Sequence, residues 1–187
     1  YSGNRVKGLV FCSSKQEAKA LSDEFNKRGF KTTSLTGEDS QEIREREVER
    51  LVADSGDVLD YIFTVDIFNE GVDIPEVNQV VMLRPTQSAI VFIQQLGRGL
   101  RKSKDKDFVV IIDFIANYKN NFLIPVALSG DNSYDKDTVR KFLSQGTRYL
   151  PGTSTIHFDE ISKQRIYSAI DNVKLNTWIF VATEYSK

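Results

Sequence analysis

Short apolar runs alternate with amphipathic segments over the first 114 residues of the chain. Runs that are apolar on both faces are typical of strands buried within a parallel sheet. Five such runs occur, at residues 6–14, 30–37, 59–65, 79–84 and 107–114. Apolar residues at helical spacing predict helices between them, at residues 15–29, 40–53 and 88–101. The alternation predicts an α/β fold, a parallel sheet with helices on both faces.

Two residues mark the expected ends of these helices. Gly29 follows the last apolar residue of the first helix and is suited to the position just past a helix C-terminus. Ser40 precedes the second helix and is a good N-cap residue. Both features support the predicted strand–helix alternation.

The pattern changes after residue 114. Helical periodicity predicts three further segments, at residues 116–128, 134–146 and 159–173. No apolar run of the strand type separates them. We therefore expect a sheet domain over residues 1–114 and a mainly helical C-terminal appendage over residues 115–187.

Composition and charge narrow the possible functions. The 187 residues carry a net charge of −1, so any binding of a polyanion must be local. A single cysteine excludes a disulfide framework and a cysteine zinc site, and indicates a reducing, cytoplasmic location. The sequence contains no run of 18 apolar residues, so we expect no membrane-spanning segment and no membrane partner. Because the chain begins Tyr-Ser-Gly, we expect it to be part of a longer protein.

Sheets of this class bind ligands in the loops beyond the carboxyl ends of their strands. One such loop offers Thr36 and Gly37, followed by Gln41 and Arg44 on the next helix. A hydroxyl group and exposed backbone amides can hold a phosphodiester without net positive charge. A simple turn with an N-cap explains the same residues equally well.

A second loop, residues 64–75, contains Gly71 and Asp73. Glycine permits a close approach of the backbone to a ligand, and a nearby carboxylate could accept hydrogen bonds from ribose hydroxyls. Taken alone, the segment is better explained as a turn in which Asp73 caps the backbone.

The segment QQLGRGLR, residues 94–101, places Arg98 and Arg101 three residues apart. Two guanidinium groups could clamp a phosphoryl group, although a solvated helix face is the simpler explanation for an arbitrary arginine pair. Gly97 and Gly99 weaken the simpler explanation, since each costs a helix about 1 kcal/mol relative to alanine.

Order and spacing decide between these explanations. Together the segments resemble the second RecA-like domain of superfamily 2 helicases and translocases. Four segments carry the resemblance: LVFCSS (9–14), LTGEDSQEIR (35–44), TVDIFNEGVDIP (64–75) and QQLGRGLR (94–101). The last one fits the family pattern Gln-x-x-Gly-Arg-x-x-Arg. The form NEGVDIP is most similar to the restriction-subunit-like and excision-repair-helicase-like members.

The resemblance implies a role for each candidate residue. Arg98 and Arg101 would reach the γ-phosphate of ATP, with Gln94 positioning them. Glu70, Gly71 and Asp73 would form one wall of the nucleotide site. The nucleic-acid backbone would lie along a track formed by Ser13, Thr36, Gly37, Thr64 and Arg44. ATP and Mg²⁺ would be shared with the preceding RecA-like domain, and this chain would contribute no metal ligand.

The chain contains no G-x-x-x-x-G-K-[ST] motif and no acidic DExH or DEAD motif. We therefore expect half of an ATP site, inactive alone, in the C-terminal motor domain of a nucleic-acid helicase or translocase. A RecA-like nucleic-acid-binding or regulatory module that does not hydrolyse ATP is the alternative. The restriction-like segment favours DNA over RNA and leaves strand separation versus translocation open.

Overall fold

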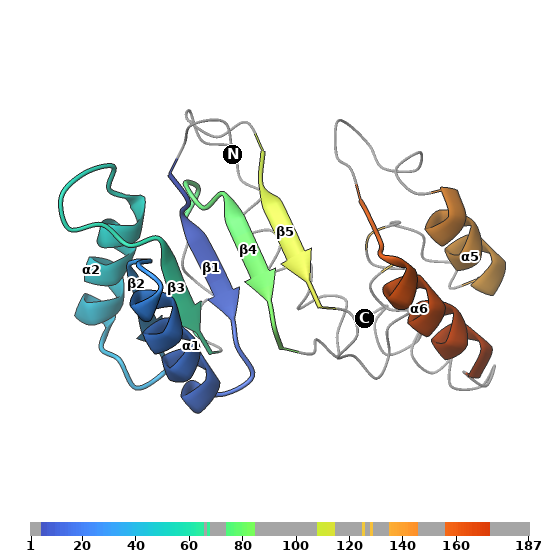
Figure 1. Ribbon diagram of the computed structural model, residues 1–187, viewed down its shortest axis with the longest axis horizontal. Coiled ribbons are helices and arrows are strands. Elements are labelled where there is room, and N and C mark those ends of the chain that lie inside the picture. Colours follow the sequence, from blue (N-terminus) through green and yellow to red (C-terminus); the bar gives the residue numbers. More distant parts are fainter. Residues whose placement is uncertain are drawn as a thin grey trace. The chain divides into compact units, whose positions relative to one another are not determined.

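The computed structural model describes residues 5–65, 67, 74–84, 108–114, 125, 128, 135–145 and 156–172. It divides the chain into two compact units (Figure 1). Unit 1 comprises residues 1–85 and 94–114, and unit 2 comprises residues 86–93 and 115–187. The domain boundary expected after residue 114 stays a prediction.

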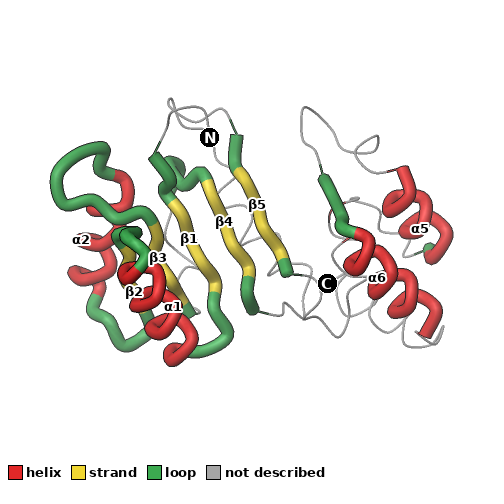
Figure 2. Tube along the Cα trace, in the orientation of Figure 1, coloured by secondary structure: helices red, strands yellow, loops and turns green. Residues whose placement is uncertain are grey.

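A parallel five-stranded sheet forms the centre of unit 1, in the order β2-β3-β1-β4-β5 (Figure 2). Its elements are β1 (Gly8–Phe11), α1 (Lys15–Lys27), β2 (Thr32–Leu35), α2 (Gln41–Val52), β3 (Tyr61–Thr64), β4 (Gln79–Met82) and β5 (Val110–Asp113). Every strand pair is parallel, which confirms the predicted α/β class. All five strands fall inside the predicted runs and are shorter than them. The predicted helix 88–101 lies outside the described residues.

The two helices of unit 1 begin and end where the sequence signals predict. Ser14 caps α1 by accepting a hydrogen bond from the Glu17 amide, and Ser40 caps α2 by accepting one from the Ile43 amide. Gly29 follows the α1 C-cap with a φ of 90°, a conformation that favours glycine. The capping signals therefore fix where the loops at the strand ends give way to helix.

The sheet has apolar side chains on both faces. The connection through α1 moves across the sheet in one direction and the connection through α2 moves back, so right-handed crossovers place the two helices on opposite faces. On the α1 face, Val10, Cys12 and Phe63 pack with Ala18. The alternate strand residues Leu9, Ile62 and Met82 are buried on the opposite face. This core holds the strand ends in a fixed relation to one another.

Strand β5 departs from the expectation of burial on both faces. It lies at an edge of the sheet, and Ile112 and Phe114 are 38% and 49% exposed. Phe108, just before the strand, is also exposed. The three residues share one face because side chains alternate along a strand.

In unit 2, α5 (Lys136–Gln145) and α6 (Glu160–Asn172) confirm two of the three predicted helices. Residues 125 and 128 are the only described residues of the third, and both are helical. Phe142 of α5 meets Phe158, before α6, edge to face at 6.4 Å between ring centroids. Arg140 and Asp171 form an ion pair between the helices at 2.5 Å. None of the described helices has the length and apolarity needed to cross a membrane.

Candidate functional site

The carboxyl ends of β2, β3 and β1 meet at one edge of the sheet, which we name the carboxyl edge. Thr64 at the end of β3 is in register with Leu35 of β2 and with Phe11 of β1. The ladder continues past the strands, because the Cys12 amide donates to the Thr64 carbonyl over 2.9 Å. The loops that contain Ser13 and Thr36 therefore emerge beside β3, as their positions after the strands predicted.

The loop after β1 runs directly into α1. Ser13 is exposed, and its backbone amide donates to Oε2 of Glu17 over 2.6 Å. The Ser14 hydroxyl accepts from the Glu17 amide over 3.1 Å. This reciprocal arrangement is close to a capping box and holds the loop against the first turn of the helix.

The loop after β2 forms a similar reciprocal turn before its helix begins. The Thr36 amide donates to Oδ2 of Asp39 over 2.7 Å, and the Thr36 hydroxyl donates to the same oxygen over 3.2 Å. The Thr36 hydroxyl in turn accepts from the Glu38 amide over 3.3 Å. Gly37, at the exposed tip, has open space where a side chain would stand, with Ile67 no closer than 4.0 Å. A partner could approach the backbone here.

Arg44 of α2 stabilises the loop after β2 through hydrogen bonds to its carbonyl groups. Its guanidinium donates to the carbonyl oxygens of Gly37 and Thr36, over 3.0 and 3.4 Å. Its Nε is buried and has no hydrogen-bond partner within the described part of the chain. The side chain therefore holds the loop's carbonyls in place, which suits the supporting role that the resemblance implied for it.

An ion pair joins the two loops across the carboxyl edge. Lys15, in the first turn of α1, contacts the carboxylate of Glu38 in the loop after β2. Reasoning from sequence singled out neither residue, nor Glu17 nor Asp39. The spacings Ser14-x-x-Glu17 and Thr36-x-x-Asp39 were the available signals, because an oxygen-bearing residue followed three positions later by a carboxylate indicates reciprocal capping.

Thr64 lies beneath the surface of the carboxyl edge. Its side chain is fully buried, and its hydroxyl has no hydrogen-bond partner among the described residues. An unmade hydrogen bond at a buried hydroxyl is unfavourable. Cys12, also fully buried, has its thiol pKa raised to about 12, first by desolvation and then by the charge of Glu17. A thiol so protected is no nucleophile at neutral pH.

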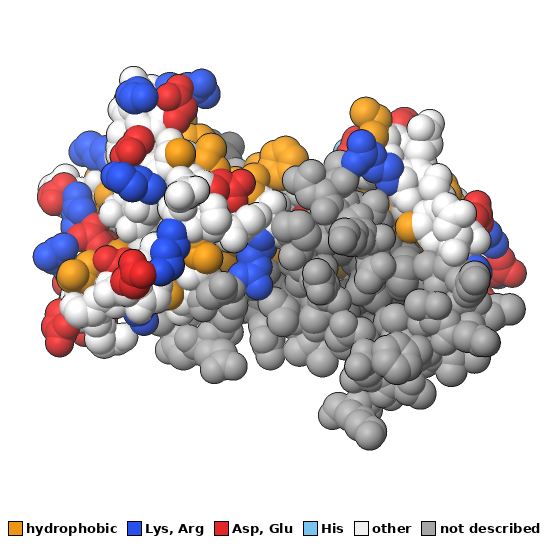
Figure 3. Space-filling model, turned by 90° about the horizontal axis from the view of Figure 1, so that it is seen from below, with side chains coloured by type: hydrophobic (Ala, Val, Ile, Leu, Met, Phe, Trp, Pro, Cys, Tyr) orange, Lys and Arg blue, Asp and Glu red, His pale blue; other side chains and the backbone are white. Residues whose placement is uncertain are grey.

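The carboxyl edge carries mixed charge. Figure 3 views the molecule from the end towards which the strands point, and its described part shows acidic and basic side chains interspersed. Among the described residues, no group of three or more His, Cys, Asp and Glu side chains is placed to hold a metal ion. The exposed side chains of Lys15 and Glu38 both belong to this mixed surface.

Six candidate residues lie outside the described part of the chain. They are the three assigned to the nucleotide wall and the three of the arginine segment: Glu70, Gly71, Asp73, Gln94, Arg98 and Arg101. Their roles stay predictions that rest on the resemblance. The described strand ends therefore include the candidates for the nucleic-acid track but not those for the nucleotide site.

Comparison with known proteins supplies the family. The model of the family described as helicase conserved C-terminal domain matches residues 2–103. A protein of Saccharomyces cerevisiae provisionally named as the ATP-dependent helicase IRC3 is 34% identical over 107 residues, which are 57% of this chain and 15% of that protein. The ATP-dependent RNA helicase SrmB of Haemophilus influenzae is 26% identical over 58% of this chain and 24% of its own length. This chain thus spans a small part of these relatives.

Solved structures agree with the fold. A fragment of a protein from Vibrio vulnificus, provisionally named as the HsdR subunit of a type I restriction enzyme, aligns with a TM-score of 0.50 and 25% identity. The alignment covers 60% of this chain and 24% of that one. The yeast DEAD-box splicing factor Prp28 aligns with a TM-score of 0.59 and 20% identity over 93% of this chain and 33% of its own. At that identity the second likeness concerns the fold alone.

Proposed function

Because the chain belongs to the helicase conserved C-terminal domain family, we propose that it is the second motor domain of an ATP-dependent DNA helicase or translocase. In this role it supplies arginines to an ATP site and forms half of the track for the nucleic acid. The relatives named as ATP-dependent helicases support the enzyme class. The particular roles below are part of the proposal.

One observation carries the nucleic-acid half of the proposal. The loops after β1 and β2 emerge beside β3 and present the exposed Ser13 and Gly37, with Thr36 directly before Gly37. Backbone amides and hydroxyls at strand ends and helix N-termini suit the phosphate oxygens of a nucleic-acid backbone. Contacts of this kind position a strand without reading its bases, and they need no large basic surface.

Thr64 takes an indirect part in this proposal. Because its side chain is buried at the end of β3, it supports the floor beneath the two loops, and Arg44 supports the loop after β2 through its carbonyls. Direct contact with phosphate falls to Ser13, Thr36 and Gly37.

The nucleotide half of the proposal rests on the family. The matched residues 2–103 include both remaining segments. Arg98 and Arg101 would stabilise the charge that develops on a transferred phosphoryl group, and Gln94 would position them. Glu70, Gly71 and Asp73 would line the nucleotide. Mg²⁺ and the phosphate-binding loop would belong to a preceding RecA-like domain of the same polypeptide.

DNA is the proposed substrate because of the likeness to the restriction-subunit fragment, at 25% identity, and the form of residues 69–75. The relative SrmB is named as an RNA helicase, so both nucleic acids belong in the test. The cytoplasm remains the proposed location, on the evidence of a single free, buried cysteine.

The test is ATP hydrolysis by this chain joined to its preceding domain, with and without single-stranded DNA, double-stranded DNA and RNA. We expect turnover that DNA stimulates and that Arg98→Ala or Arg101→Ala lowers by about 10³-fold, as for an arginine finger. Arg28→Ala is the matched control, since Arg28 is an exposed residue of the α1 C-terminus paired with Glu24.

Each result has a clear meaning. Turnover that neither arginine affects would contradict the arginine-finger role. No turnover, together with intact nucleic-acid binding, would favour a module that does not hydrolyse ATP. Stimulation by RNA alone would replace DNA with RNA in the proposal.

A further inference from the structure

Carboxylates of the chain itself occupy the donors of the carboxyl edge. Oδ2 of Asp39 accepts from both the amide and the hydroxyl of Thr36, over 2.7 and 3.2 Å. Oε2 of Glu17 accepts from the Ser13 amide over 2.6 Å. The Glu38 carboxylate accepts from the ammonium group of Lys15. Two positions of the proposed phosphate track, Ser13 and Thr36, and the nearby Lys15 thus already have an anionic partner.

A phosphate oxygen would compete for the same donors. The backbone amides of Ser13 and Thr36 carry one hydrogen each, so strong bonding of either amide to phosphate requires its carboxylate to leave; the Lys15 ammonium group has three hydrogens and has no such requirement. A carboxylate that stayed would also repel the incoming phosphate, because like charges a few ångströms apart disfavour each other. Anionic groups of the chain therefore already occupy these donors before any nucleic acid arrives.

Asp39 differs from Glu17 in what it does for the helix that follows. Glu17 lies inside the first turn of α1 and forms part of its cap. Helix α2 begins at Gln41 and has its own N-cap, because the Ser40 hydroxyl accepts from the Ile43 amide over 3.3 Å. Asp39 is thus not needed to cap α2, and its bonds to Thr36 can break without unwinding a helix.

The loop would keep its shape when Asp39 leaves. Arg44 donates to the carbonyl oxygens of Thr36 and Gly37. These acceptors are different groups from the donors that Asp39 occupies. Departure of the carboxylate would therefore expose the Thr36 amide and hydroxyl on a loop that is still braced.

We propose that Asp39 acts as an intramolecular stand-in for a phosphate group, which the nucleic-acid backbone displaces from Thr36, and that this exchange sets the affinity of the carboxyl edge. The proposal rests on the nucleic-acid-binding function proposed above. Asp39 would thus set the affinity for the nucleic-acid backbone without contacting a base. Glu17 occupies the Ser13 amide in the same way, and Glu38 pairs with Lys15.

The test compares two variants that remove one negative charge each. Asp39→Asn keeps an oxygen that can accept from the Thr36 amide but loses the charge. Asp57→Asn is the control at the opposite end of the sheet, where Asp57 pairs with Arg50 at 2.8 Å. Fluorescence anisotropy of labelled 12-nucleotide oligo-dT and oligo-U, bound to the 187-residue chain, gives affinities at several salt concentrations.

We expect Asp39→Asn to tighten oligo-dT binding by about 5-fold relative to Asp57→Asn at low salt, and the gain to shrink as salt screens the charge. Asp39→Ala should bind at least as tightly as wild type, because it removes the competitor altogether. In the wild-type chain, oligo-dT should shift the Thr36 amide in a ¹H–¹⁵N NMR spectrum. Thermal unfolding of each variant confirms that it is folded.

Equal affinities for Asp39→Asn and Asp57→Asn would overturn the proposal, as would weaker binding by folded Asp39→Ala, which would make Asp39 a structural cap. If oligo-dT binds with no shift at Thr36, the exchange is wrong while the motor function still stands on its ATPase test. If no variant binds either oligonucleotide, the exchange and the proposed track both fall.

Discussion

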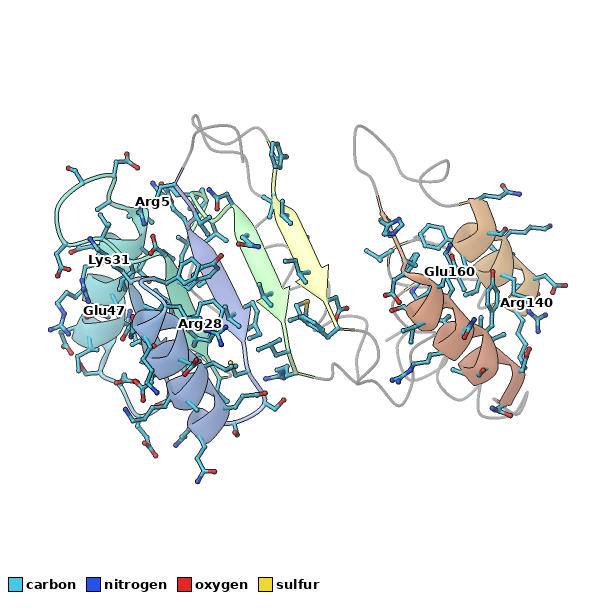
Figure 4. All side chains as sticks on the ribbon, in the orientation of Figure 1. Arg5, Arg28, Lys31, Glu47, Arg140 and Glu160 are labelled. Carbon is cyan, nitrogen blue, oxygen red and sulfur yellow. The ribbon has the colours of Figure 1, made fainter. Side chains whose placement is uncertain are left out.

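The two ends of the sheet use charge in opposite ways. At the amino edge, where the strands begin, the cations Arg5 and Lys7 hold main-chain carbonyls at the C-terminus of α2. Arg5, labelled in Figure 4, lies just before β1. It donates to the carbonyls of Leu51, Ala53 and Leu59. Lys7 donates to the Val52 carbonyl over 2.6 Å and to Asp54 over 2.7 Å. These cations replace a glycine cap, because the last carbonyls of a helix need partners.

At the carboxyl edge the donors are mostly neutral and the partners are anions. Thr36 and Ser13 bond to carboxylates, and the guanidinium of Arg44, from α2, donates to carbonyls of the loop. Under the proposals above, the position of cations does not mark the phosphate track of this domain. The track is instead formed by groups whose present partners phosphate would displace.

The largest effect should follow from removing Arg5. Arg5→Ala leaves several carbonyls without a partner, two of them from the buried Leu51 and Leu59. We expect the free energy of unfolding to fall by about 3 kcal/mol. For a unit of this size the melting temperature should fall by roughly 10 °C or more. Circular dichroism during thermal and urea unfolding measures both.

The control for this variant is Arg28→Ala. Arg28 is 67% exposed and pairs with Glu24 at 3.1 Å, so its loss should change stability by less than about 1 kcal/mol. Neither variant should alter the affinity of the folded chain for oligo-dT. An Arg5→Ala chain with wild-type stability would show that the amino edge does not depend on its cations. A loss of affinity there would remove the contrast between the edges.

The sequence predicted the strands of the sheet but not the hydrogen bonds of Arg5 and Lys7 at their amino ends. The apolar runs and the caps Ser14, Gly29 and Ser40 are local signals, so the strand positions, the helix ends and the place of the candidate loops at the carboxyl ends of the strands could be expected in advance. The bonds of Arg5 reach residues 46 to 54 positions away. Such partners depend on tertiary packing, which no local pattern encodes.

The candidate site divides in the same way. Thr36 and Gly37 could be found because a strand end followed by a helix cap is visible in the sequence. The burial of Thr64 could not be predicted from the sequence, because it follows from the strands β1 and β2 on either side of β3. Asp39 was passed over because its carboxylate matters through its bonds to Thr36, and a lone acidic residue in a loop is ordinary.

A smaller effect should follow from removing Arg44 at the carboxyl edge. Arg44→Ala frees the carbonyls of Thr36 and Gly37, and the loop loses the brace that orients its amides. We expect affinity for oligo-dT to fall by about 5-fold, the equivalent of about 1 kcal/mol. Stability should fall by about 1 kcal/mol or less, because the loop is near solvent. Anisotropy and thermal unfolding separate the two quantities.

Arg46→Ala is the matched control for this change. Arg46 lies on the same helix, is 64% exposed and pairs with Glu47, which keeps Arg50 as a second partner at 2.5 Å. The Arg46→Ala substitution removes one positive charge, as Arg44→Ala does, but leaves the contacts of the loop after β2 unchanged. If both variants lost affinity equally, the helix would act through its net charge, and the positioning role of Arg44 would be wrong.

The smallest effect concerns one carboxylate at each end of α2. At the N-terminus, a hydrogen bond from the Ser40 hydroxyl, helped by the backbone, lowers the pKa of Glu42 below its ordinary value. At the other end, the hydrogen bond and then the charge of Lys7 lower the pKa of Asp54. A carboxylate with a lowered pKa stabilises the fold above its unfolded pKa. That contribution is lost as the pH falls through its folded pKa.

The two carboxylates should respond differently to salt, because a neutral hydroxyl holds one and a cation holds the other. Raising the salt to 1 M should move the pKa of Asp54 back towards its ordinary value and leave that of Glu42 nearly unchanged. Ser40→Gly, which is a mild change at an N-cap, should raise the pKa of Glu42 alone, and Lys7→Met should raise that of Asp54 alone. Carboxyl-carbon NMR shifts between pH 2 and 7 follow each residue. Equal salt shifts at both would mean that ions hold both ends of α2, and the contrast between hydroxyl and cation would be lost.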